Sequence, residues 1–127
     1  MMQFLWVCLG GAVGTGARHL ATHWFSARFA SPLPYGTWFV NVGGSFLMGA
    51  IMCVGLDSTA LSLTTRVALT TGFLGGLTTY SAFSYQTVAA LREGALGLAL
   101  TNLMVTTFAC LLSCWAGIGV ARWWLTR

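Results

Sequence analysis

Long apolar runs alternate along the chain with short polar or turn-forming breaks. The apolar runs cover Met2–Ala21, Thr37–Leu56, Val67–Leu91 and Ala95–Trp123. A helix needs about 20 apolar residues to cross the roughly 30 Å hydrocarbon core of a bilayer. The pattern therefore predicts an all-α membrane protein whose four transmembrane helices form one domain over residues 1–127.

The breaks between the runs are short and contain residues that favour turns. Residues 31–36 read SPLPYG, residues 57–59 read DST, and residues 92–94 read REG. Proline, glycine, serine and aspartate at these points end helices and begin turns. The first run lacks the basic segment that precedes the apolar core of a signal peptide, so we interpret it as a transmembrane helix.

Composition and charge support a membrane location and exclude several functions. Hydrophobic residues make up 57% of the chain and charged residues 6%, far below the roughly 25% of an average soluble domain. A net charge of +4 on such a chain indicates membrane flanks rather than a nucleic-acid surface. No nucleophile, base and acid can be placed at one depth, so we do not expect an enzyme.

The arginines are balanced between the two ends of the predicted bundle. Loops with excess arginine normally face the cytoplasm, so their distribution sets orientation. The two sets are Arg66, Arg122 and Arg127 at one end, and Arg18, Arg28 and Arg92 at the other. Three against three gives no bias, which predicts insertion in both orientations and pairing as an antiparallel homodimer.

Small residues recur at four-residue spacing in two of the runs. Gly10 and Gly14 share a face in the first run, as do Ser45 and Gly49 in the second. Such faces let helices approach closely within lipid. The four cysteines lack CxxC spacing, so we interpret them as packing residues too.

Polar residues follow one face of the second run. Thr37, Asn41, Ser45 and Gly49 are spaced four apart. Because unpaired polar groups are costly in lipid, this face must meet another helix or line a wet cavity. The second run alone leaves both interpretations open.

The third run contains three glycines and two threonines at its centre, between Gly72 and Thr79. Glycine weakens helices, so the pattern predicts either a helix broken at its centre or a kink for packing. Carbonyls freed by a break commonly bind a cation. Beyond it, Tyr80 and Phe83 share one helical face, and Ser81 and Ser84 share the next.

No carboxylate lies inside any run, because the only acids are Asp57 and Glu93 at the breaks. Cation channels and proton-coupled exporters usually have acidic residues in the pathway. Amides, hydroxyls, aromatic ring edges and Arg18 suit an anion better. In the fourth run, Asn102 and Thr106 lie four apart on one face.

Three segments resemble the signature motifs of the Fluc/CrcB fluoride channels, in order and at the family's spacing. They are GGAVGTGARH at 10–19, YGTWFVNVGGSFLMG at 35–49 and TGFLGGLTTYSAFS at 71–84. The resemblance implies an antiparallel dual-topology homodimer in the bacterial inner membrane, with two pores and a structural sodium ion at the dimer centre. It implies that fluoride leaves the cytoplasm by passive electrodiffusion.

The resemblance also assigns roles residue by residue. The fluoride pore positions fall on Asn41, Tyr80, Phe83, Ser81 and Ser84, with Ser113 as a fourth-helix candidate; the sodium-binding carbonyls fall on Gly75 and Thr78; and Arg18 takes a vestibule or structural role. The chain departs from the usual TTFSTF motif at Tyr80 and Ala82, and Gln86 stands where many members have a glutamate.

Two other functions remain as alternatives. A small multidrug exporter is also a four-span, dual-topology dimer, but it depends on a membrane-embedded glutamate that this chain lacks. A subunit with a purely structural role fits the composition equally well, and only a measurement of ion flux separates it from a channel.

Overall fold

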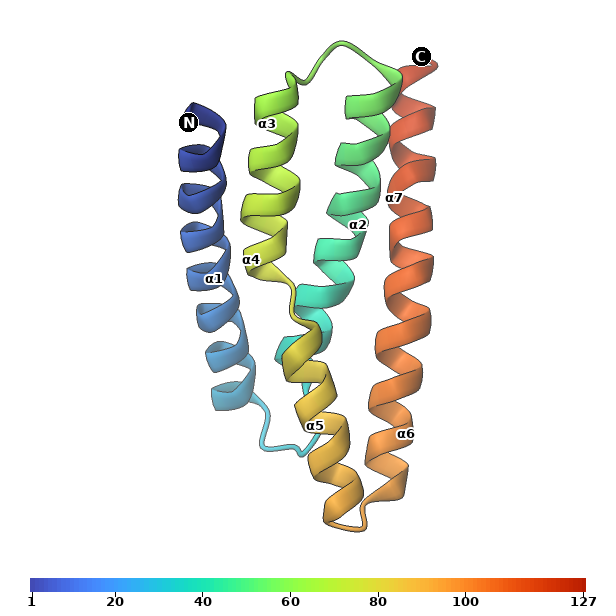
Figure 1. The fold of residues 1–127 in the computed structure, drawn as a ribbon. Helices are drawn as coiled ribbons and strands as arrows, with labels where there is room; N and C mark the ends of the chain where they lie inside the picture. Colours follow the sequence, from blue (N-terminus) through green and yellow to red (C-terminus); the bar gives the residue numbers. More distant parts are fainter.

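A computed structural model describes residues 1–127, and every regular element in it is helical. The elements are α1 (Met2–Arg28), α2 (Tyr35–Asp57), α3 (Leu63–Val67), η1 (Ala68–Leu74), α4 (Gly75–Leu77), α5 (Tyr80–Arg92), α6 (Leu96–Met104), η2 (Val105–Ala109) and α7 (Cys110–Leu125). They follow one another as four rods in an up-and-down bundle, with both termini at the same end (Figure 1).

The rod boundaries lie close to the predicted ones, except at the end of α1. This helix continues to Arg28, beyond the predicted end at Ala21, because no glycine or proline lies between Ala21 and the SPLP segment. At the opposite turn, Gly94 adopts a φ of 73°, which glycine takes without strain, and reverses the chain between α5 and α6.

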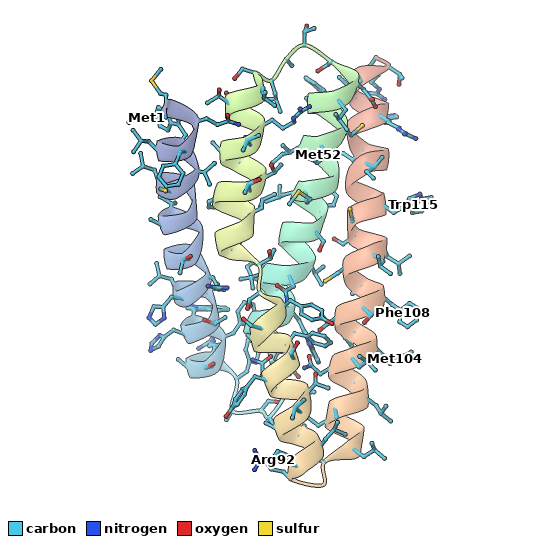
Figure 2. The ribbon with its side chains drawn as sticks, viewed as in Figure 1. Met1, Met52, Arg92, Met104, Phe108 and Trp115 are labelled. Atoms are coloured by element: carbon cyan, nitrogen blue, oxygen red, sulfur yellow. The ribbon has the colours of Figure 1, made fainter.

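Two of the rods satisfy the length and hydropathy of a membrane span. Tyr35–Asp57 has a mean hydropathy of 1.8 and Leu96–Leu125 a mean hydropathy of 1.9 over their most apolar windows. Only 19 of 127 residues are buried, so most of the apolar side chains face outward. Phe108 and Trp115 point away from the bundle along the fourth rod (Figure 2). This distribution suits a membrane protein, whose surroundings are themselves apolar.

Glycines bring the rods together in pairs. The most extensive contacts join α2 to α7 and α1 to η1. A Cβ at Gly14 would overlap the carbonyl oxygen of Phe73, and a Cβ at Gly117 would overlap the carbonyl oxygen of Phe46. The small-residue faces predicted from sequence therefore lie at helix contacts, Gly10 and Gly14 against the third rod and Gly49 against α7.

Two wide π-helical turns, η1 and η2, interrupt the third and fourth rods. In η1 the Thr70 hydroxyl donates to the carbonyl of Arg66 at 2.8 Å. A π turn has one residue more than an α turn and often lies at a functional position. No feature of the sequence predicted either turn.

Candidate functional site

The third rod is interrupted at Thr78 and Thr79, whose backbones are extended. Their φ and ψ angles are −84° and 157° for Thr78, and −150° and 115° for Thr79. Gly72, Gly75 and Gly76 remain helical, so the chain leaves the helix after the glycines rather than at them. The Thr79 hydroxyl then accepts the Ala82 N–H at 3.1 Å and caps α5.

Asn41 pairs with both backbone groups of Thr79. Its Nδ2 donates to the Thr79 carbonyl at 3.0 Å, and its Oδ1 accepts the Thr79 N–H at 2.7 Å. Both side chains are more than 90% buried. The two bonds fix the orientation of the amide and satisfy the buried, interrupted backbone, as a neighbouring strand would do. One N–H of the amide is left for another acceptor.

Carbonyl groups at the interruption are released from helical pairing. In a continuous helix the Thr79 N–H would donate to the carbonyl of Gly75, but here it donates to Asn41. The carbonyl of Thr78 accepts a bond from Arg18 Nη1 at 3.1 Å. Gly75 begins the three-residue helix α4 and Thr78 directly follows it, with Arg18 bonded to the Thr78 carbonyl.

An aromatic pocket of about 520 Å³ lies on one side of the interruption, between the second, third and fourth rods. Its lining includes Asn41, Thr79, Tyr80, Phe83, Thr106, Cys110 and Cys114. The rings of Tyr80 and Phe83 are 5.3 Å apart and edge-on at 61°. Phe83 is 6% exposed, so its ring is fixed by packing. Tyr80 is 79% exposed, so its ring lies at the surface of the chain.

An arginine pocket of about 840 Å³ lies on the other side of the interruption. It is lined by residues that include Arg18, Thr37, Thr79, Ser81 and Gln86. The hydroxyls of Ser81 and Thr79 are 3.2 Å apart and hydrogen-bonded. Thr79 lines both pockets, so the interruption is where they meet.

Two of the hydroxyls assigned to the pore lie outside both pockets. The Ser84 hydroxyl donates to the carbonyl of Tyr80 on its own helix at 2.9 Å. The Ser113 hydroxyl donates to the carbonyl of Val42 at 2.9 Å and joins α7 to α2. Ser84 and Ser113 therefore line neither pocket, whereas the aromatic pair, Asn41, Ser81 and Arg18 each line one of them.

Sequence reasoning placed Thr106 on a polar face but did not assign it to the site, and it interpreted Cys110 and Cys114 as packing residues. Thr106, Cys110 and Cys114 continue the four-residue spacing that begins at Asn102, and this spacing was the available signal. On the other side, Gln86 Nε2 donates to the Thr37 hydroxyl at 2.9 Å, whereas its buried Oε1 has no partner. No spacing rule could have predicted that pairing across 49 residues.

The chain is similar to a known family over nearly its whole length. The family model described as "CrcB-like protein, Camphor Resistance (CrcB)" matches residues 5–118. A protein of Anaeromyxobacter sp. (strain K), named fluoride-specific ion channel FluC, is 43% identical over 97% of this chain and 98% of its own length. A protein of the same name from Citrifermentans bemidjiense is 44% identical over 96% of this chain and 98% of its own length. These matches establish that the chain belongs to the CrcB family.

Proposed function

We propose that this protein is a fluoride-selective channel of the bacterial inner membrane that lets fluoride leave the cytoplasm by passive electrodiffusion. The observation that carries the proposal is the interruption held by Asn41, where two pockets meet at Thr79. The names of the relatives support the choice of ion. Asp57 lies at the end of α2 and Glu93 follows α5, so the acids are remote from the interruption, unlike those of proton-coupled exporters.

Fluoride is small and strongly hydrated, so a selective path must offer donors that replace its water. The free N–H of the Asn41 amide, the hydroxyls of Thr79 and Ser81, and the positive ring edges of Tyr80 and Phe83 are the available groups. Each of these groups binds an anion weakly, so the ion can also be released. Arg18 binds the Thr78 carbonyl and takes a structural role at the entrance.

The working unit in this proposal is an antiparallel, dual-topology homodimer of four-span subunits with two pores. Both pockets are open to the outside of the single chain, and Tyr80 is 79% exposed beside one of them. A second copy would cover these surfaces and narrow each pocket. The sequence division of the arginines supports insertion in both orientations, three against three when Arg18 is counted, although Arg18 bonds to the Thr78 carbonyl at the interruption.

Sodium is the proposed structural cofactor of the dimer. The carbonyl of Gly75 has lost the donor that a continuous helix provides, and the Thr78 carbonyl has one lone pair left beside its bond to Arg18. Carbonyl oxygens released from a broken helix are typical sodium ligands, so the residues fit the ion. Bound there, sodium would neutralise the partial negative charge at the end of α4.

Efflux from liposomes that contain only this purified protein tests the proposal. We expect rapid loss of trapped fluoride, measured with a fluoride electrode, and retention of chloride in a parallel sample. Equal flux of both ions would contradict selectivity. Absence of flux from protein that elutes as one species on size-exclusion chromatography would favour the alternative of a subunit with a purely structural role.

Native cysteines allow a test of the route through the aromatic pocket. A small methanethiosulfonate that modifies Cys110 or Cys114 adds bulk to the pocket wall, and a barrier raised by about 1.4 kcal/mol slows flux roughly tenfold. We expect the reagent to inhibit the parent protein. It should inhibit Cys8→Ser equally, because Cys8 is exposed on α1 and does not line the aromatic pocket. The fluoride flux of the double variant Cys110→Ser/Cys114→Ser should be the same before and after treatment with the reagent. Inhibition that survives in this double variant would place the route elsewhere.

A further inference from the structure

Asn102 forms hydrogen bonds with every donor and acceptor of its side-chain amide, although it touches neither pocket. Its Oδ1 accepts from Trp38 Nε1 at 2.7 Å and from the Thr106 hydroxyl at 3.3 Å. Its Nδ2 donates to the Thr87 hydroxyl at 2.9 Å and to the Phe83 carbonyl at 3.4 Å. The side chain is 2% exposed and has no bond left for an ion.

The four partners come from three different rods. Trp38 belongs to α2, Phe83 and Thr87 to α5, and Thr106 to η2. The Phe83 carbonyl also accepts from the Thr87 hydroxyl at 2.8 Å, so Asn102 and Thr87 both hold α5 at the residue whose ring lines the aromatic pocket. Buried polar networks in which every member is satisfied fix one arrangement of the elements around them.

We propose that Asn102 is a positioning residue for Phe83 and that it thereby sets the discrimination between fluoride and chloride. This inference rests on the proposed function. The interruption at Thr78 and Thr79 leaves α5 without a continuous helix at its N-terminal end, so its position depends on lateral bonds. Chloride is larger than fluoride and needs a wider passage beside the ring. Loosening α5 at Phe83 widens that passage.

Two variants remove hydrogen bonds between Asn102 and α5, and each replaces a side chain by one of similar size. Thr87→Val removes the hydroxyl that joins Asn102 to α5, and Asn102→Asp removes the amide donors. Thr101→Val is the matched control, because Thr101 is exposed on the same helix as Asn102. We expect the ratio of fluoride to chloride flux in liposomes to fall about tenfold in the first two variants, a typical effect of a small change in pocket fit. The control should keep the parent ratio.

A second measurement tests positioning without transport. With 4-fluorophenylalanine at position 83, ¹⁹F NMR in detergent should give one sharp resonance in the parent and a shifted or broadened one in Thr87→Val. An unchanged spectrum and flux ratio in variants that elute like the parent would overturn the proposal. Proportional loss of both fluxes with an unchanged spectrum would reduce Asn102 to a stability role and would also overturn it. A parent without selective flux would instead refute the proposed function, and the spectrum would still report on the network.

Discussion

Asn41→Leu is expected to abolish fluoride flux and to destabilise the fold, because both backbone groups of Thr79 lose their partner. Each buried polar group left unpaired costs about 1–3 kcal/mol, so the two together lower the free energy of unfolding by several kcal/mol. Displacement of the interruption also moves Tyr80 and Phe83. A loss of flux of roughly 100-fold corresponds to a barrier raised by about 2.7 kcal/mol. Liposome flux and thermal unfolding in detergent measure the two effects.

Asn41→Asp separates the two bonds. The aspartate keeps an oxygen for the Thr79 N–H but loses the amide donor to the Thr79 carbonyl, so its midpoint of unfolding should lie between those of the parent and Asn41→Leu. Its flux should fall as well, because the free N–H of the amide is also lost. A parent-like unfolding midpoint for Asn41→Leu would show that the amide does not support the interruption.

Gly14→Ala is expected to have the largest effect on assembly of the bundle. The added methyl group would overlap the carbonyl oxygen of Phe73 and lie 2.9 Å from the Leu77 nitrogen. Both are backbone atoms, so no side-chain rotation relieves the overlap and α1 must move away from the third rod. Overpacking of this kind typically costs about 1–3 kcal/mol, and a backbone clash belongs at the upper end of that range. The measurement is the midpoint of thermal unfolding, with aggregation followed by size-exclusion chromatography.

Gly16→Ala provides the matched control on the same helix. A Cβ at Gly16 meets no atom within 4 Å, and alanine in a helix is favoured over glycine by up to about 1 kcal/mol. This variant should therefore unfold at the parent temperature or slightly above it. Equal midpoints for the two variants would mean that α1 does not pack against the third rod through Gly14.

The helical fold was predictable because hydrophobic length and turn residues determine it locally. The four runs gave the rods, and glycine spacing gave the contacts at Gly10, Gly14 and Gly49. The end of α1 was wrong by seven residues, since polar residues at a membrane edge continue a helix as readily as apolar ones do. The π turns depend on backbone pairing that no residue pattern specifies.

The candidate site was predictable in part. Three-residue spacing placed Tyr80 beside Phe83, and their rings are in contact. The burial of Phe83 and the exposure of Tyr80 depend on other rods, which helical spacing does not describe. Hydroxyls are the least predictable groups, because a serine can bond to its own helix, as Ser84 does, or to another, as Ser113 does.

The π turn η2 has a consequence for the direction in which the fourth rod presents its side chains. Four residues exceed one turn of an α-helix, so a stripe with four-residue spacing gradually winds around the helix. A turn that holds an extra residue cancels part of this angular drift. Thr106, within η2, therefore stays in phase with Cys110 and Cys114, and all three face the aromatic pocket. The irregular turn keeps one wall of the pocket straight over about two turns of helix.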